Sequence, residues 1–589
     1  MARTNLRLAC LCGVVVLIAF LIVNPFAEMP FDDDWSYAFT VRRLLETGHI
    51  IYNGWSAPVL ITQVYWGAMF CKVFGFSFTA LRFSMLPFAM GSAVICFLLG
   101  RLSGLRSASA VFAALLLGLS PMFLPLATSF MTDVPGLFFM LFSIYALAKS
   151  ALTRRIAWLA AAVVAAIIGG MSRQVVWIVP LISIPYLLWI GRNDRRFRAA
   201  AVAGWILVLI DVIATQSWFS SQHDVVIDPP LLTCLQSAMR NPWFGLDRGG
   251  RFILTLFLLT LPVGAGLAIL VANACRHRMR LLVLSVLVGA ALALDIHFHR
   301  ELLLWPWSPN LLWPDGILIR NELSGRVSAA MPEWFVTAWS VLVFIALGAS
   351  LATLLDSATR WRNLVTVAKR IFFPRNGDAV LIIMAIVGIA YLALLLARST
   401  LALVFDRYAL PMVPIVAIFT LLFVQRSFPD SRIRRFTFTI CSIVLAFYAA
   451  LSLAATRDLL ALARARVQAI NMLRDAGVAP TAIAAGLEYD CWTQLHRQRQ
   501  VNWVYASNRT VLFRPQLGLA PALWCLYCVE YLPAADTQRS EFPPIRYTSW
   551  LPPFHRTIYI DKFLDPWWIS RPPTDGRSPK PGLVDFETF

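Results

Sequence analysis

The stretch LACLCGVVVLIAFLIVN (residues 8–24), followed at once by PFAEMPFDDDWSY (25–37), decides the fold class of this chain. As a helix rising about 1.5 Å per residue, the first stretch approaches the thickness of the hydrocarbon core of a bilayer, about 30 Å. It ends in Asn24-Pro25-Phe26, without a small-residue cleavage site. We therefore expect a retained helix that crosses a membrane rather than a removed signal peptide.

Apolar runs of similar length recur along the whole chain. Of its 589 residues, 59% are hydrophobic and only 14% are charged, whereas soluble proteins average about 25% charged residues. Twelve further runs have the length of a span, at about 83–100, 108–127, 134–148, 156–171, 175–190, 200–217, 252–273, 281–296, 334–355, 379–397, 409–425 and 436–455. The sequence therefore predicts an α-helical polytopic membrane protein with about 13 transmembrane helices.

The basic residues are unevenly distributed between the loops, which predicts how the helices run. Lys and Arg concentrate in cytoplasmic loops of membrane proteins. With a cytoplasmic N-terminus and alternating helices, the cytoplasmic side holds 23 basic and four acidic residues, and this excess equals the whole net charge of +19. The high isoelectric point thus reflects topology and not nucleic-acid binding. We expect a multi-pass protein of the cytoplasmic (inner) membrane whose C-terminus is extracytoplasmic.

Two parts of the chain outside the membrane carry most of its polar residues. The first outer loop, 25–82, contains two helix-like stretches rich in aromatic residues, which suit helices lying in the membrane interface. From residue 456 the composition becomes polar and no span-length run remains. We therefore predict a transmembrane domain at 1–455 and a small C-terminal α/β domain at 456–589, outside the cytoplasm.

Acidic side chains cluster where the first predicted helix leaves the membrane. Asp32, Asp33 and Asp34 are adjacent and precede Trp35 and Tyr37. Adjacent carboxylates that are partly desolvated either hold a cation or have one raised pKa, which suits a general base. The alternative is a solvated turn in which an Asp caps the helix beginning near Trp35, although capping needs one Asp and not three.

A second acidic site, Asp133, precedes Pro135 at the predicted outer mouth between the third and fourth helices. Asp before a helix that starts with Pro is a good N-cap, which is the simpler interpretation. Its position on the same predicted membrane face as Asp33 and Asp34 favours a shared site.

Two arginines are predicted on that same outer face. Arg173 lies in the short turn between the fifth and sixth helices, and Arg407 precedes the twelfth. Basic residues are disfavoured outside, so each indicates an anionic partner such as a phosphate. For Arg407 the alternative is an ion pair with its neighbour Asp406.

Three further features are weaker: the intramembrane Asp211 and Asp295, the alternating His297-x-His299-x-Glu301, and Cys525-x-x-Cys528. We interpret the second as a hydrogen-bonded interfacial cluster, and the cysteines could form a disulfide in the outer domain. The histidine and cysteine spacings also occur at metal sites, but no second ligand pair follows the cysteines.

These residues, taken in order, resemble those of the membrane-embedded GT-C glycosyltransferases, and most closely the bacterial branch related to protein O-mannosyltransferases and the lipid A aminoarabinose transferase. The resemblance covers residues 1–425 in layout and is sharpest over 25–190. The family's acidic pair and the aromatic residue after it fall on Asp33-Asp34 and Tyr37. Its second acidic residue falls on Asp133 and its basic residue on Arg173. Its Arg-Tyr-x-Leu-Pro segment falls on Arg407, Tyr408, Leu410 and Pro411.

One departure concerns the first outer loop. Relatives carry a basic residue before Pro-Pro there, whereas this sequence reads Ser56-Ala57-Pro58. The phosphate contact that relatives make at this point either comes from Arg82 or Arg173 or is missing.

The resemblance implies transfer of a sugar from a polyprenyl-phosphate donor to an acceptor hydroxyl, with inversion, at the outer membrane face. Asp33 or Asp34 would be the general base, while Arg173 and Arg407 would hold the donor phosphate. The acceptor would be a lipid, a glycan or a protein.

The remaining site residues follow from the same resemblance. Tyr37, Arg82 and Tyr408 would complete the substrate-binding site. Asp133 would position the acceptor or contribute to a divalent-cation site, whose candidate ligands are Asp33, Asp34 and Asp133.

The main competing function is a polytopic transporter or lipid flippase. Transporters place charges near the membrane midplane and are built from repeated halves. Asp211 and Asp295 would support that function, but no repeat is evident, and the other charges cluster at the outer mouths. A non-catalytic membrane scaffold that binds partners through its outer domain is a third alternative.

Overall fold

The computed structural model describes residues 2–274, 287–290, 310–313, 316–317, 323, 331–359, 378–401, 404–427, 431–501, 519–520, 522–533 and 537–564. In this part of the chain, seven helices are long and apolar enough to cross a membrane, or eight when a bent pair counts as one span. The seven are α1 (Ala2–Ile22), α4 (Phe78–Leu102), α7 (Asp133–Thr153), α10 (Arg195–Ser220), α16 (Glu333–Thr359), α18 (Asp378–Arg398) and α20 (Ser431–Asp475).

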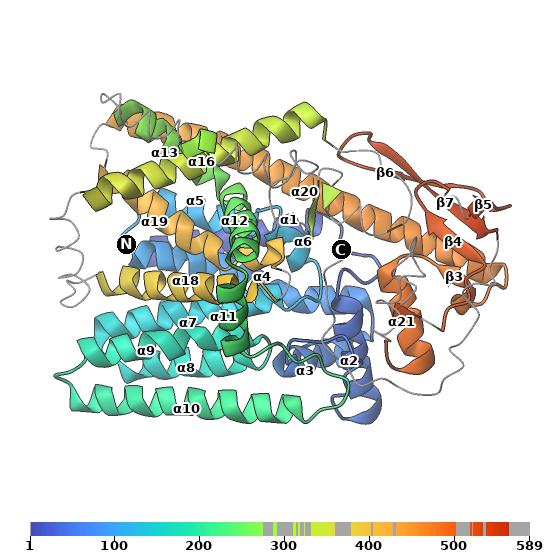
Figure 1. The fold of residues 1–589 in the computed structure, drawn as a ribbon, viewed down its shortest axis with the longest axis horizontal. Helices are drawn as coiled ribbons and strands as arrows, with labels where there is room; N and C mark the ends of the chain where they lie inside the picture. The colour runs from blue at the N-terminus through green and yellow to red at the C-terminus, as the bar shows by residue number, and fades with distance from the viewer. Residues whose placement is uncertain are drawn as a thin grey trace.

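Shorter apolar helices account for most of the other predicted runs. They are α5 (Ser107–Gly118), α8 (Ile156–Gly170), α9 (Ile178–Ile190) and α19 (Met412–Ser427). The run at 281–296 lies mostly outside the described residues. Figure 1 shows these helices side by side across the view, with the sheet of the C-terminal region beyond one end of the bundle. The predicted fold class, an α-helical polytopic membrane protein, is confirmed.

One predicted span is sharply bent. The run at 252–273 forms α12 (Pro242–Leu259) and α13 (Leu261–Ala274), whose axes meet at 82°. Pro262 stands directly after the break, and proline cannot donate the backbone hydrogen bond that a continuing helix requires. The apolar run therefore predicted where this helix pair lies in the sequence but not the bend between its two helices.

Small residues let the helices of the bundle approach closely. A Cβ on Gly91 of α4 would lie 2.5 Å from the Phe138 ring of α7, and one on Gly118 of α5 would lie 2.6 Å from Val16 of α1. In a bilayer such close van der Waals packing is a main source of helix association. These contacts assemble the early helices, whose loops at one end carry the acidic and basic residues singled out above.

The first outer loop contains the two helices predicted from its sequence. They are α2 (Asp34–Thr47) and α3 (Ile61–Phe74). Along α3, the exposed side chains include Tyr65, Val73 and Phe74, the last two about 70% exposed. An apolar exposed face beside membrane-spanning helices fits a helix that lies in the interface. A further short helix, α11 (Leu231–Arg240), follows α10 and also exposes leucines.

The C-terminal region is a small α/β unit built on the end of α20. Its strands are β3 (Ile483–Ala484), β4 (Tyr527–Glu530), β5 (Thr537–Arg539), β6 (Ile545–Thr548) and β7 (His555–Phe563), with α21 (Leu487–Gln498) after β3. The strand order is β3-β4-β7-β5, and β6 also pairs with β7. Among these described strand pairs, β3–β4 is parallel and the others are antiparallel. A separate two-stranded ladder joins β1 (Leu312–Trp313) and β2 (Gly316–Ile317).

The helix α20 connects this unit to the bundle without interruption. It runs for 45 residues, so the predicted domain boundary at 455–456 falls within it. In Figure 1 it extends from the bundle to the sheet. The unit therefore rests on a continuation of a transmembrane helix rather than on a linker.

A second contact joins the C-terminal unit to the first outer loop. Trp492 of α21 stacks on Phe76 with ring centroids 6.0 Å apart and packs edge-on against Phe39 of α2. Arg42 Nη1 lies 3.0 Å from His496 Nε2. Burial and the adjacent arginine lower the pKa of His496 to about 4, so its neutral ring accepts this hydrogen bond at neutral pH. The helix that begins with the acidic cluster thus contacts the C-terminal unit.

Candidate functional site

Arg407 joins the two segments that carry the predicted acidic and basic motifs. It lies in the short 3-10 helix η2 (Asp406–Ala409) ahead of α19 and is 6% exposed. Its Nη1 donates to the carboxylate of Asp32, and its Nη2 donates to Asp33 Oδ2 at 2.7 Å. Such charge-assisted hydrogen bonds are about twice as strong as neutral ones. The first outer loop and the start of α19 therefore meet in one ion cluster.

The start of α2 explains why Asp33 faces this cluster. Asp33 occupies the N-cap position, yet its side chain makes no capping hydrogen bond. Its Oδ1 instead accepts a hydrogen bond from Trp55 Nε1 at 2.8 Å. Asp32 has a φ of 50°, a left-handed conformation that Asp adopts more readily than most residues. The capping alternative for Asp33 is therefore wrong, and the turn presents two carboxylates to Arg407.

Asp133 and Arg173 form a second ion pair. Asp133 Oδ1 lies 2.8 Å from Arg173 Nη1, which also donates to Thr132 Oγ1 at 2.8 Å. Thr132 holds the N-cap position and Asp133 is the first residue of α7, so the N-cap interpretation of Asp133 is wrong. Asp133 Oδ2 is buried without a hydrogen-bond partner among the described residues. A buried oxygen without a donor is costly, so this atom is available to accept a further hydrogen bond.

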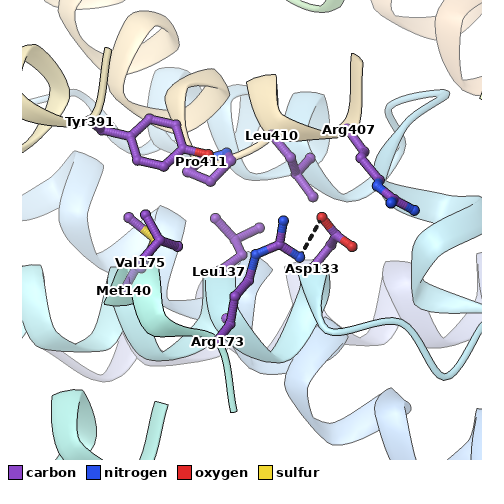
Figure 2. A pocket seen from close by; sticks show the side chains of 10 residues that line it. Asp133, Leu137, Met140, Arg173, Val175, Tyr391, Arg407, Leu410 and Pro411 are labelled. Atoms are coloured by element: carbon purple, nitrogen blue, oxygen red, sulfur yellow. Dashed lines mark ion pairs between the residues drawn. The ribbon is translucent and has the colours of Figure 1, made fainter. Parts of the chain in front are cut away.

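Figure 2 shows the pocket that these side chains share. In this view Arg173 and Asp133 approach the pocket from below and Arg407 from the upper right. Val175 and Met140 lie at the left. The lining residues are Asp133, Gly136, Leu137, Met140, Arg173, Val175, Tyr391, Arg407, Leu410 and Pro411. The pocket therefore has a charged part and an apolar part.

Two tyrosines support the arginines of the pocket. The centroid of the Tyr408 ring lies 5.4 Å from the guanidinium carbon of Arg173 and 5.9 Å from that of Arg407. Tyr391, on α18, donates its hydroxyl to the Tyr408 carbonyl at 2.8 Å. An aromatic ring near two cations offsets part of their repulsion. Tyr408 therefore holds two positive charges near each other.

Asp406 has a different role from the one its sequence position suggested. Its carboxylate accepts hydrogen bonds from the backbone N–H groups of Leu311 and Leu312 at 2.9 Å each and of Arg407 at 2.7 Å. The alternative in which Asp406 pairs with the Arg407 guanidinium is therefore wrong. Burial raises the pKa of Asp406 to about 6, although the three N–H groups oppose this. Asp406 fixes the backbone at Arg407.

Asp34 turns away from its two neighbours. It is 1% exposed, and its carboxylate accepts hydrogen bonds from the N–H groups of Phe31 at 2.5 Å and of Phe130 at 3.1 Å. Phe130 lies between α7 and the short α6 (Phe123–Ala127), which together with α5 covers the predicted run at 108–127. Burial raises the pKa of Asp34 to about 7. This residue ties the first outer loop to the start of α7 and does not line the pocket.

Two other predicted binding residues are also buried. Arg82 is 1% exposed and donates through its terminal nitrogens to the carbonyl oxygens of Ala27 and Met29. It therefore organises the loop after α1 rather than lining the pocket. Tyr37 is 4% exposed within α2; burial and the nearby Asp33 charge raise its pKa.

The acidic residues do not fit the predicted divalent-cation site. Within the described ranges, no three His, Cys, Asp or Glu side chains are arranged to hold a metal ion. Asp33 and Asp133 each contact a guanidinium instead, and Asp34 binds backbone N–H groups. The candidate cluster at 297–301 lies outside the described residues.

Three residues of the site were not assigned a role from the sequence, although Asp32 belongs to the predicted acidic cluster. Asp32 stands one position before the acidic pair of the resembled family, and Trp55 and Tyr391 make their contacts across the fold. For Tyr391 a signal was available, because it is the one hydroxyl-bearing side chain of the otherwise apolar run at 379–397.

Residues 60–218 match the family model described as dolichyl-phosphate-mannose-protein mannosyltransferase. The predicted resemblance is confirmed for this segment. It contains Arg82, Asp133 and Arg173, whereas Asp33 and Arg407 lie outside it. The matched family consists of glycosyltransferases, and this match is the comparison that bears on function. No curated protein matches the chain.

Several solved structures are similar to the chain. They include ArnT from Cupriavidus metallidurans bound to undecaprenyl phosphate, at 13% identity over 79% of this chain and 72% of that chain, with a TM-score of 0.39. The oligosaccharyltransferase AglB from Archaeoglobus fulgidus is 14% identical over 78% of this chain and 57% of that chain, with a TM-score of 0.40. The Pmt1-Pmt2 complex of S. cerevisiae is 14% identical over 36% and 32%, with a TM-score of 0.31. Scores at this level do not establish a common fold.

Proposed function

We propose that this protein transfers a sugar from a polyprenyl-phosphate-linked donor to an acceptor hydroxyl, with inversion, at the outer face of the cytoplasmic membrane. The observation that carries the proposal is the shared pocket, in which Arg173, Arg407 and Asp133 meet from three separate segments. Asp33 is connected to it through Arg407. The family match over 60–218 supports the same reaction.

The two arginines bind the phosphate of the donor. Guanidinium groups match phosphate oxygens in geometry and charge. Arg407 Nε is buried and has no hydrogen-bond partner among the described residues, so this guanidinium has donor capacity left. When a phosphate binds, Arg407 shifts part of its hydrogen bonding from the carboxylates to the phosphate. Asp33 then keeps its bond from Trp55 and loses its compensating cation.

Asp33 is the general base of the proposed reaction. Its Oδ2, released from Arg407, accepts the proton of the acceptor hydroxyl as the hydroxyl oxygen bonds to the anomeric carbon. The bond between that carbon and the phosphate oxygen breaks, and polyprenyl phosphate leaves with the electron pair. Arg407 and Arg173 stabilise the charge that develops on the leaving group, so no general acid is required. A single displacement inverts the anomeric carbon.

Asp133 positions the acceptor. Its unpartnered Oδ2 is an acceptor for a hydroxyl on the sugar or on the attacking group. The proposal assigns no step to a divalent cation, because the carboxylates already contact guanidinium groups. Asp34 and Arg82 are left out of catalysis, since their polar atoms bind backbone groups.

The transporter alternative has little support in the described residues. Asp211, within α10, accepts hydrogen bonds from Trp177 Nε1 at 2.8 Å and from Thr215 at 3.2 Å. A carboxylate bonded in this way serves packing between helices. Asp295 lies outside the described residues.

The test uses the full-length protein in proteoliposomes, with a panel of labelled polyprenyl-phosphate sugars and cell envelope extract as the source of acceptor. We expect the wild type to release polyprenyl phosphate from one donor, and Arg407→Gln to slow this release by about 100-fold or more. Arg198→Gln, at an exposed arginine near the start of α10, is the matched control and should match the wild type. If Arg407→Gln and Arg173→Gln both turn over normally, the proposal is wrong.

A further inference from the structure

Two arginines on α20 have no salt-bridge partner among the described residues where the helix leaves its apolar run. Arg457 and Arg464 follow the predicted span 436–455 and stand on one face, about two turns apart. Arg457 Nη1 and Arg464 Nη2 are buried and have no hydrogen-bond partner among the described residues. Both residues nevertheless keep part of their surface exposed. They are therefore cations with unused donor groups near the edge of the membrane.

Two carboxylates of this region, Asp458 on α20 and Glu488 on α21, are already bound elsewhere. Asp458 accepts hydrogen bonds from Ser549 Oγ at 2.6 Å, from Trp550 N at 2.6 Å and from Leu551 N at 2.9 Å. Glu488 is paired with Arg466 at 2.8 Å. Neither acidic side chain forms an ion pair with Arg457 or Arg464 in the described structure.

Several positively charged side chains surround Arg464. Arg464 Nη1 donates to the Asn24 carbonyl at 2.8 Å, at the end of α1. Arg457 and the buried Arg82 both act on Arg464 as repelling charges. Asp34 and Glu28 offset the charge of Arg82, so the repulsion that an anionic ligand would relieve is the one between Arg457 and Arg464. The electrostatics of this region therefore favour a negatively charged ligand.

The surroundings indicate that this ligand is a lipid. Phe26, beside Arg464, is 56% exposed, and Trp550 and Phe554, on the loop between β6 and β7, are 47% and 55% exposed. The guanidinium of Arg457 lies 5.5 Å from the Trp550 ring centroid. Exposed aromatic rings beside arginines at the end of a transmembrane run are typical of the headgroup region of a bilayer.

We propose that Arg457 and Arg464 bind the phosphate headgroup of an anionic phospholipid in the leaflet beside the pocket. Phe26, Trp550 and Phe554 would contact its glycerol and upper acyl region. The bound lipid would join α1, α20 and the β6–β7 loop, so the C-terminal unit would be anchored to the bilayer as well as to α20. None of these residues lines the donor pocket.

The test measures lipid binding and does not depend on transferase activity. The full-length protein is placed in nanodiscs of phosphatidylcholine alone or with phosphatidylglycerol, and co-purified lipid is quantified by native mass spectrometry alongside the unfolding temperature. We expect the wild type to retain phosphatidylglycerol and to unfold at a higher temperature with it. Arg457→Gln combined with Arg464→Gln should weaken retention roughly thirtyfold, at about 1 kcal/mol for each arginine. Arg474→Gln, at an exposed arginine further along α20, is the matched control.

A second experiment distinguishes a phospholipid headgroup from free phosphate as the ligand. Inorganic phosphate is added to wild-type protein in phosphatidylcholine alone, and we expect no rise in unfolding temperature. A rise equal to that with phosphatidylglycerol would overturn the lipid assignment in favour of a free-anion site. Equal retention of both lipids by the wild type would also overturn it, and this comparison needs no variant. Arg457→Lys combined with Arg464→Lys, which keeps both charges, should retain most of the binding.

Discussion

The hydrogen-bond partners of Asp33 and Asp34 separate two carboxylates that are adjacent in sequence. Asp33 binds the guanidinium of Arg407, which lines the pocket, and the indole N–H of Trp55. A bound phosphate can draw the guanidinium away while the indole N–H stays in place. Asp34 binds two backbone N–H groups in a region closed to solvent. Only the first arrangement leaves a carboxylate free to exchange a proton with a substrate.

Substituting the two residues should therefore give opposite results. Asp33→Asn should lower turnover by about 10²–10⁴-fold, the usual contribution of a general base, with little change in unfolding temperature. Asp34→Asn should lower stability by about 1–3 kcal/mol, because an amide NH₂ would face a backbone N–H. Turnover and thermal unfolding of both variants test this. A stable but inactive Asp34→Asn beside an active Asp33→Asn would reverse the assignment.

Asp406 gives a prediction about pH. Its folded pKa of about 6 lies above the ordinary value of 3.8, so the folded state binds its proton more tightly than the unfolded state. Its contribution to stability is fully present below pH 4 and is lost as the pH rises through 6. The unfolding temperature should fall over this interval, and by less in Asp406→Asn, which cannot ionise. If the unfolding temperatures of the wild type and of Asp406→Asn fall equally with pH, Asp406 does not contribute to stability in this way.

At the scale of single residues, the sequence located the charged groups but not their partners. Arg407 meets Asp33 across 374 positions of chain, and no local spacing encodes such a contact. The capping alternatives for Asp33 and Asp133 were reasonable because both residues do stand at helix starts. They failed because a buried guanidinium competes for these carboxylates more strongly than a backbone N–H does.

Among the elements, α20 has the largest structural role, since it is both a span and the support of the sheet. Hydrophobicity located its apolar part, but the polar composition after residue 455 suggested that a separate domain begins there. Amphipathic packing explains the difference, because Leu460, Leu462 and Ala469 of its polar half are buried with Ile483, Val529 and Ile558 of the sheet. A helix continues wherever tertiary contacts replace lipid on its apolar face.

The contact between α20 and the loop after β6 is held by one carboxylate. Asp458→Ala would leave the N–H groups of Trp550 and Leu551 and the hydroxyl of Ser549 without their acceptor. We expect the loop at 549–554 to become a site of rapid proteolysis, with a loss of stability of about 1–3 kcal/mol. Limited proteolysis with mapped cleavage sites tests this, with Asp475→Ala at the end of α20 as the control. Unchanged cleavage would mean that the loop is held by its other contacts.

At the scale of the whole molecule, the pocket, the first outer loop and the C-terminal unit lie at one end of the bundle. The elements that carry them contact each other through α2 and α21. The charge distribution could predict this shared side, because the positive-inside rule depends on composition and not on contacts. It could not predict that Trp492 stacks on Phe76, since that contact joins two units with no common sequence pattern.

This arrangement makes the orientation of the protein a testable prediction. Asn193, between α9 and α10, and Gln468, in the outer half of α20, are both exposed. With a membrane-impermeant maleimide, Gln468→Cys should react in intact cells and Asn193→Cys only after permeabilisation, with the wild type as the background. Cys10 is the exposed cysteine of the described residues, and it lies within the apolar α1. The opposite labelling pattern would place the pocket on the cytoplasmic side and would exclude a donor from the outer leaflet.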